Sequence, residues 1–176
     1  MIRRAAAAAL IVLGLVGCGG DSDERAEQPP RVDDAFVVRL LAQQQAGAEV
    51  VRAAGERVEE PAVKRLVERM ERVREPRVAE LATANQGVRN RDELADLGVS
   101  AEQAAEDIGP NALDGVEPVT PAFLALMTRH DEGTIALARA QIQRGQRPEL
   151  KTLARRVLTE STRELAEISR VLQQTR

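Results

Sequence analysis

The chain has very few of the residues that build catalytic and cofactor sites. Its 176 residues include one His, one Cys and two Phe, and it has no Trp or Tyr. One His and one Cys are too few for a zinc finger, a His-rich zinc site, an iron–sulfur cluster site or an internal disulfide. Two aromatic side chains give no platform for stacking bases and no aromatic cage for a quaternary amine. These absences exclude several of the commonest metal, cofactor and ligand sites.

The charge balance gives no basic excess. Lys and Arg number 25 against 28 Asp and Glu, which gives a formal net charge of -3. Because domains that bind nucleic acids usually carry a clear positive excess, we expect no nucleic-acid partner. The length suits one domain with a real core, and the abundance of Ala, Leu, Glu, Arg and Gln favours an all-α fold.

The first residues have the pattern of an export signal. Two arginines precede an apolar run, and the only cysteine follows in Leu15-Val16-Gly17-Cys18. A charged start followed by a short apolar run is typical of a secretion signal rather than of a spanning helix. Leu-Val-Gly-Cys resembles the lipobox of bacterial lipoproteins, in which the signal is cut before the cysteine and the thiol receives diacylglycerol. The alternatives are an uncut anchor and an ordinary free thiol.

This resemblance implies an arrangement of the whole chain. Residues 1–17 would be a lipoprotein signal peptide, and Cys18 would be lipidated and serve as the contact with the membrane. Residues 18–31 are Gly, Pro and charged residues with almost nothing apolar, which predicts a disordered tether. Residues 32–176 would form the folded domain, outside the cytoplasm and anchored to a bacterial cell membrane by lipid.

The folded part contains an internal repeat with an offset of 87 residues. Over 35–81 against 122–168 the same residue type recurs at eleven positions, which are Ala35, Phe36, Arg52, Ala53, Arg57, Pro61, Lys64, Leu66, Arg69, Ala79 and Glu80. The pairs include both Phe residues and a Pro at each expected start of a second helix. We interpret the pattern as a duplicated unit, with repeat 1 at about 33–85 and repeat 2 at about 120–174.

Each repeat predicts a hairpin of two helices. Apolar residues recur every three or four positions in both halves of each unit, and no stretch has the alternation of a strand. Two hairpins bury their apolar faces most simply as a four-helix bundle. The second helix of repeat 1 has Val73 in its apolar stripe and Pro76 inside it, which should kink or shorten it.

Residues 86–119 form a long connection that spans the bundle or crosses one end. Ser100 and Gln103 resemble a capping box that opens a short helix to about Ile108. Thr120-Pro121 predicts the start of the third helix.

Polar residues interrupt the apolar stripes at the same depth in both repeats. Gln43 stands in the stripe of the first helix and His130 in that of the third, with Gln44 and Asp131 beside them. The duplication predicts that Gln43 and His130 face each other across the bundle. Polar groups there need partners, because an unpaired buried one costs about 1–3 kcal/mol. In the second helices, Arg74 or Arg77 could neutralise one of three carboxylates, namely Asp131, Glu132 or Glu164.

These residues carry a resemblance to a known family. The stretch from Phe123 to Ile168 resembles the second repeat of the domain-of-unknown-function 305 family, through Phe123, Leu124, Met127, His130, Gly133, Ala138, Gly145, Pro148, Glu149, Leu153, Ala154 and Glu164. The first half is similar more weakly, through Asp34, Phe36, Glu49, Pro61, Val63 and residues 74–78. The resemblance implies a ferritin-like bundle, common in exported or membrane-tethered proteins. Some members bind copper or silver through His-His and Met positions.

The sequence departs from that family pattern at the metal-binding positions. One His-His pair is Gln43-Gln44, the other is His130-Asp131, and the Met positions are Val50 and Leu137. Soft ions such as Cu(I) prefer sulfur or imidazole to amide oxygen. His130 and Asp131 are the remaining candidate ligands, and two protein donors are few for a stable site.

We therefore expect a bundle protein without catalytic activity and without a cofactor, with a binding or envelope-associated role. The alternative is binding of copper, silver or another metal ion, as in the family. A third hypothesis, an oxidative enzyme of ferritin type, needs Glu and Glu-x-x-His sets that a single His cannot provide.

Overall fold

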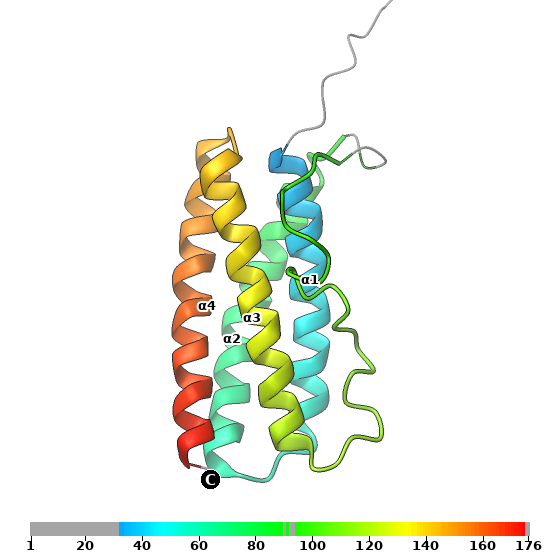
Figure 1. Cartoon of the computed structure of the whole chain (residues 1–176), viewed down its shortest axis with the longest axis vertical. Helices are drawn as coiled ribbons and strands as arrows, with labels where there is room; N and C mark the ends of the chain where they lie inside the picture. The colour runs from blue at the N-terminus through cyan, green and yellow to red at the C-terminus, as the bar shows by residue number, and fades with distance from the viewer. Residues whose placement is uncertain (1–31, 90, 92–93, 175–176) are drawn as a thin grey trace, which may run out of the picture.

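The computed structural model describes residues 32–89, 91 and 94–174, and this part of the chain forms a bundle of four helices without strands. The helices are α1 (Val32–Gly55), α2 (Pro61–Asn85), α3 (Val119–Arg144) and α4 (Pro148–Gln174). Figure 1 shows α1 paired with α2 in one hairpin and α3 with α4 in the other. The prediction of an all-α bundle built from two tandem hairpins is confirmed. The signal peptide, the tether and Cys18 lie outside the described residues.

The long connection determines how the hairpins face each other. It returns along the length of the bundle, so that α3 begins at the end where α1 finishes (Figure 1). As a result α1 and α3 pack against each other in opposite directions. One long crossover is a known way to connect a four-helix bundle. Within the described residues, no helix is both long and apolar enough to cross a membrane.

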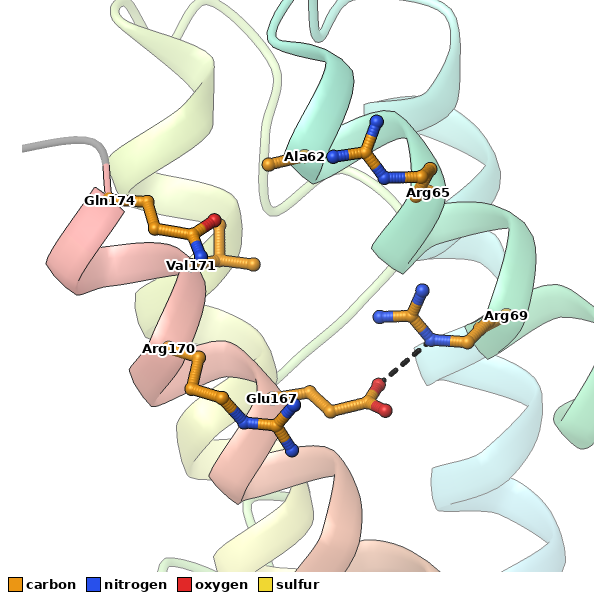
Figure 2. A pocket seen from close by; sticks show the side chains of 7 residues that line it. All are labelled: Ala62, Arg65, Arg69, Glu167, Arg170, Val171 and Gln174. Atoms are coloured by element: carbon orange, nitrogen blue, oxygen red, sulfur yellow. Dashed lines mark hydrogen bonds and ion pairs between the residues drawn. The ribbon is translucent and has the colours of Figure 1, made fainter.

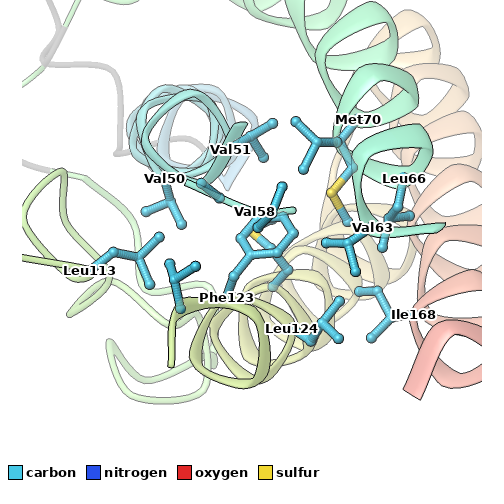
Figure 3. Packing of buried hydrophobic residues seen from close by; sticks show 14 of the residues in the cluster. Val50, Val51, Val58, Val63, Leu66, Met70, Leu113, Phe123, Leu124 and Ile168 are labelled. Atoms are coloured by element: carbon cyan, nitrogen blue, oxygen red, sulfur yellow. The ribbon is translucent and has the colours of Figure 1, made fainter. Parts of the chain in front are cut away.

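Two apolar clusters form the core, one toward each end of the bundle. Phe123 lies in the cluster of Figure 3, among residues of α1, α2 and α4 such as Val50, Leu66 and Ile168. Its repeat equivalent, Phe36, lies in the other cluster. Both Phe side chains are fully buried. The repeat therefore places the same residue type at the same structural position, once in each cluster.

Two sequence predictions concern the second helix of repeat 1, one on Pro76 and one on Val73. Pro76 does not shorten it, because α2 continues to Asn85. Val73, expected in the apolar stripe, is exposed instead. Arg74, the next residue along the helix, is buried. The rotation of α2 is thus set so that a charged side chain, rather than its apolar neighbour, enters the interior.

Each end of the bundle is fastened by the first turn of a helix from the other repeat. At one end the Asp33 carboxylate accepts hydrogen bonds from the backbone N–H groups of Gln146 and Arg147, just before α4 begins. It also accepts one from the Gln141 side chain. At the other end Thr120, the repeat equivalent of Asp33, donates a hydrogen bond of 2.7 Å to Glu60 Oε2, just before α2.

The start of α3 also differs from the prediction. The helix begins at Val119 after Pro118, and no side chain caps it. The Thr120 hydroxyl is not free to cap α3, because it is directed to Glu60.

The short helix predicted after Ser100 is a single turn. Its start is as expected, because the Ser100 hydroxyl accepts from the Gln103 N–H and the Gln103 side chain accepts from the Ser100 N–H. Ala105 has a φ of 54°, and the N–H of Glu106 bonds back to the Ala101 carbonyl. This is the geometry of a Schellman ending, which terminates a helix. The prediction of a helix to about Ile108 was therefore wrong.

Candidate functional site

A layer of polar side chains crosses the middle of the bundle. We call it the central polar layer, and every member is buried: Gln43, Gln44, Arg74, Arg77, His130, Asp131, Thr134, Ser161 and Glu164. Along each of the four helices these residues stand between members of the two apolar clusters. The layer contains the predicted site residues His130, Asp131, Gln43 and Gln44, and it brings them together with two arginines.

Gln43 and His130 face each other as the repeat predicts. The Gln43 side-chain amide donates to the His130 backbone carbonyl over 3.1 Å. The His130 Nε2 lies 3.1 Å from the Gln43 backbone carbonyl. Each side chain thus reaches the backbone of its own repeat equivalent, which places the approximate two-fold axis of the bundle between them. The duplication alone was sufficient to predict this pair.

Two glycines allow this close approach. A Cβ on Gly47 would lie 2.3 Å from His130 Nε2, and a Cβ on Gly133 would lie 2.5 Å from the Ala104 carbonyl oxygen. That carbonyl accepts a 2.6 Å hydrogen bond from the Gln43 amide. Because the turn in the connection ends at Ala104, its carbonyl is free to do so. The connection thereby covers the seam between α1 and α3 and closes the layer on that side.

Arg74 is the central cation of the layer. Its guanidinium group donates two hydrogen bonds to the Glu164 carboxylate, one of them 3.2 Å long between Nη1 and Oε2. Its Nη2 also lies 3.6 Å from Asp131 Oδ1. Side chains of Arg74 and Asp131 each expose only 1% of their surface, so the pair is almost free of solvent screening. Of the pairings that the sequence left open, Arg74 takes both Glu164 and Asp131.

Arg77 binds at the edge of the same layer. Its Nη1 donates to the Gln44 side-chain oxygen over 2.9 Å, and its Nη2 pairs with Glu160 over 2.5 Å. The Gln44 amide in turn donates to the Thr134 hydroxyl. Glu132, a candidate partner by sequence, is exposed and takes no part. Glu160 could not be identified from the sequence, because it is only half-buried, beside the apolar stripe of α4.

Burial changes the ionisation of three groups in the layer. Loss of hydration, together with the nearby Arg74 charge, lowers the pKa of His130 to about 3. Loss of hydration also raises the pKa of Asp131 and of Glu164, although Arg74 opposes both shifts. His130 is therefore neutral at physiological pH, and the two carboxylates are harder to ionise than in water.

The neutral ring has a defined tautomer. The Gln43 carbonyl can only accept, so Nε2 of His130 carries the proton. Nδ1 is left as an acceptor that faces Asp131 Oδ1 at 3.5 Å. An unprotonated nitrogen this close disfavours a charged carboxylate, in the same direction as the raised pKa of Asp131.

The donor set does not fit a metal ion. Nδ1 of His130 and the carboxylate of Asp131 are adjacent, but the Arg74 guanidinium already lies against that carboxylate. A second cation would have to displace Arg74 or accept its repulsion. Among residues 32–89, 91 and 94–174, no three or more His, Cys, Asp or Glu side chains are grouped so as to hold a metal. His130 and Asp131 alone provide too few ligands for a stable site.

The layer is equally unsuited to nucleophilic catalysis. Ser161 Oγ is buried in the layer without a hydrogen-bond partner. A Ser nucleophile needs a base within hydrogen-bond reach. The proton-bearing nitrogen of His130 is instead directed to a backbone carbonyl, and the whole ring is fully buried. The arrangement thus lacks both an activated nucleophile and access for a substrate.

Comparison with known proteins gives a family match over part of the chain. Residues 100–172 match the family model described as domain of unknown function (DUF305). No curated protein matches the chain. The match covers the end of the connection, α3 and most of α4, which is the half in which the sequence resemblance is stronger.

Solved structures match nearly the whole fold. A crystal structure of a DUF305 fragment from Deinococcus radiodurans has a TM-score of 0.65 and 20% identity, and the match covers 83% of this chain and 99% of that one. CopM in the Cu(I)-bound form has a TM-score of 0.64 and 19% identity, over 81% of this chain and 96% of that one. CopM in the Ag-bound form is similar, with a TM-score of 0.63 and 18% identity over the same shares. The described bundle therefore has the fold of the DUF305 fragment and of CopM, and residues 100–172 carry the DUF305 sequence pattern.

Proposed function

We propose that this chain is a DUF305-type bundle protein without catalytic activity, in which a buried arginine replaces a bound cation. The observation that carries the proposal is the position of Arg74, between Glu164 and Asp131 at the centre of the central polar layer. A guanidinium group there donates hydrogen bonds to Glu164 and places a positive charge beside Asp131, so the charges of the layer are balanced without a metal. The protein would then act through its surface, in a binding or envelope-associated role.

Binding of copper or silver is the second candidate function. The likeness to CopM in Cu(I)-bound and Ag-bound forms favours it over a binding role of unspecified kind. At sequence identities of 19% and 18%, the likeness to CopM concerns the fold alone. The ligands must come from this chain, and in the central polar layer the candidates are His130 and Asp131, because Glu164 is already bound to Arg74. The two functions make opposite predictions for a metal titration.

We expect no saturable binding when the protein is titrated anaerobically with Cu(I) or with Ag(I) in a calorimeter, and no rise in its melting temperature. Any ion entering the layer would meet the Arg74 charge and only two donors. The variant His130→Gln places the repeat-equivalent residue at position 130 and is the matched control. Micromolar binding by the unaltered protein that His130→Gln abolishes would establish the metal function and contradict the closed, arginine-filled layer.

We also propose that the protein is attached to the membrane through lipid on Cys18 and faces away from the cytoplasm. The sequence supports this through the charged start, the apolar run and the lipobox-like residues before Cys18. One acyl chain gives only marginal membrane binding, whereas diacylglycerol carries two acyl chains and anchors a protein stably.

The anchor makes a mass prediction. The protein extracted from membranes of an expressing bacterium should lack residues 1–17 and carry diacylglycerol on Cys18 when its intact mass is measured. The variant Cys18→Ser should show neither change. Recovery of an unaltered chain with residues 1–17 still attached would refute lipidation.

A further inference from the structure

One surface groove of the bundle concentrates positive charge that the fold does not neutralise. It lies between the first turns of α2 and the last turns of α4, has a volume of about 150 Å³, and is lined by Ala62, Arg65, Arg69, Glu167, Arg170, Val171 and Gln174. Figure 2 shows the arginines of the two helices around this groove. The volume equals about five times the share of one water in the liquid, which is room for a small ion.

Two of the three arginines have no acidic partner. Arg69 pairs with Glu167 over 2.9 Å, and this contact crosses the groove. Arg65 and Arg170 are exposed, and within the described part of the chain neither makes an ion pair or a side-chain hydrogen bond. Three positive charges against one negative leave the groove with a surplus of two. The whole chain has a net charge of -3, so this local positive charge is opposite in sign to the overall charge.

The end of a helix adds to the positive potential. Ala62 is the second residue of α2, and the start of α2 has no side-chain cap. The first N–H groups of a helix have no partner within it, and they favour anions near them. At the opposite end the Asp33 carboxylate binds the N–H groups of Gln146 and Arg147, which precede α4 and are equivalent to Glu59 and Glu60. At the start of α2 the Glu60 carboxylate accepts from Thr120 and lies against the backbone of Glu59 and Glu60, so the surplus positive charge comes mainly from the arginines.

Comparison of the two repeats distinguishes the groove residues that recur in both halves of the bundle from those that occur in one half only. The pair Arg69–Glu167 recurs in the other half as Arg156–Glu80, at equivalent positions. It therefore belongs to the packing of α2 against α4 at both ends. The equivalents of Arg65 and Arg170 are Thr152 and Thr83, and that of Ala62 is Glu149. The second end thus lacks cations at these two positions and has a carboxylate in place of Ala62.

We propose that the groove is a binding site for an oxyanion of the phosphate class, held by the guanidinium groups of Arg65 and Arg170 near the start of α2. Guanidinium presents paired N–H donors that match two phosphate oxygens, and helix starts are common phosphate sites. Arg69 neutralises Glu167, which is the carboxylate that lines the groove. The anion has two sources with this chemistry, a free phosphate and a phospholipid headgroup.

The test is calorimetric titration of the full chain, kept in detergent, with two probes. Inorganic phosphate represents the free ion, and glycerophosphoglycerol represents a headgroup without its lipid tails. We expect saturable binding of at least one probe, weakened about tenfold or more by Arg65→Gln and by Arg170→Gln, because each removes a charged hydrogen-bond donor. Arg163→Gln is the matched control, because Arg163 is an exposed arginine two turns earlier on α4 without an ion pair among the described residues.

The outcomes separate the sources and can overturn the site. Binding of phosphate alone assigns the groove to a free ion, and binding of glycerophosphoglycerol assigns it to a headgroup. Absence of saturable binding for both probes overturns the proposal. Binding that persists unweakened in the double variant Arg65→Gln with Arg170→Gln also overturns it, because the anion then binds elsewhere. Circular dichroism of each variant shows whether the bundle is still folded.

Discussion

Replacing Arg74 with Ala should lower the free energy of unfolding by about 3–5 kcal/mol, the usual cost of removing one partner of a buried ion pair. The variant leaves Glu164 and Asp131 buried beside a cavity, without the guanidinium group that pairs with both. For a domain of this size the melting temperature should fall by on the order of 10 °C. Chemical denaturation followed by circular dichroism measures the change.

Two further variants identify the cause of this loss. Arg72→Ala changes an exposed arginine two residues away on the same helix, and surface changes of this kind stay within about 0.5 kcal/mol. The triple variant Arg74→Met, Asp131→Asn and Glu164→Met removes all three charges together. It should be more stable than Arg74→Ala, because no uncompensated charge remains in the interior. A triple variant less stable than Arg74→Ala would contradict the electrostatic explanation.

The loss in Arg74→Ala should also depend on pH. Burial holds the pKa of Asp131 and of Glu164 above the ordinary value, and Arg74 limits both increases. A carboxyl whose pKa is higher in the folded state binds its proton more tightly there, so the folded state loses stability as pH rises from the ordinary carboxyl range. Without Arg74 this effect becomes larger. The free energy of unfolding of Arg74→Ala should therefore be closest to that of the unaltered protein in acid. The two values should differ most at neutral pH.

His130 should make the protein sensitive to acid. Its pKa is about 3 in the folded state against 6.5 for an exposed imidazole. The unfolded state therefore binds the proton more readily, and the stability that the neutral ring provides is lost as pH falls below 6.5. The slope approaches about 1.4 kcal/mol for each pH unit. This pH dependence has the opposite sign to that of Asp131 and Glu164. It is therefore measured as the difference in stability between the unaltered protein and a variant without His130.

The measurement compares the unaltered protein with His130→Gln over a series of pH values. Gln cannot titrate, and its amide can still donate to the Gln43 carbonyl. The stability difference should be constant above about pH 7 and should then move in favour of the Gln variant by about 1–1.4 kcal/mol per unit between about pH 6 and pH 4. Chemical denaturation at each pH gives the difference. A difference that does not change with pH would show that His130 is not held neutral by burial.

Several features of the bundle were predictable from the sequence because the chain contains two copies of one unit. The offset of 87 residues was enough to pair Gln43 with His130, and it gave Phe36 and Phe123 equivalent places in the core. It also relates Asp33 to Thr120, which the sequence interpretation did not use. That equivalence could have identified the two contacts that fasten the ends of the bundle, although their chemistry differs.

The capping box at Ser100 shows where local pattern stops being informative. Its two hydrogen bonds form as the residues predict. The length of the turn depends instead on a distant group, because the Ala104 carbonyl must turn to meet the Gln43 amide. Likewise, Val73 and Arg74 are neighbours on one helix, and periodicity alone favoured burial of the valine.

The sequence by itself determined the class of fold, the two hairpins and the depth at which polar residues interrupt the core, because these follow from periodicity and duplication. Only the tertiary structure decided that Arg74 would fill the centre of the layer, between Glu164 and Asp131. It also decided that Arg65 and Arg170 would share one groove without a partner. The physical reason is that charge pairing depends on how the packed helices are rotated and how far apart they lie. One sequence pattern is compatible with several such rotations and separations.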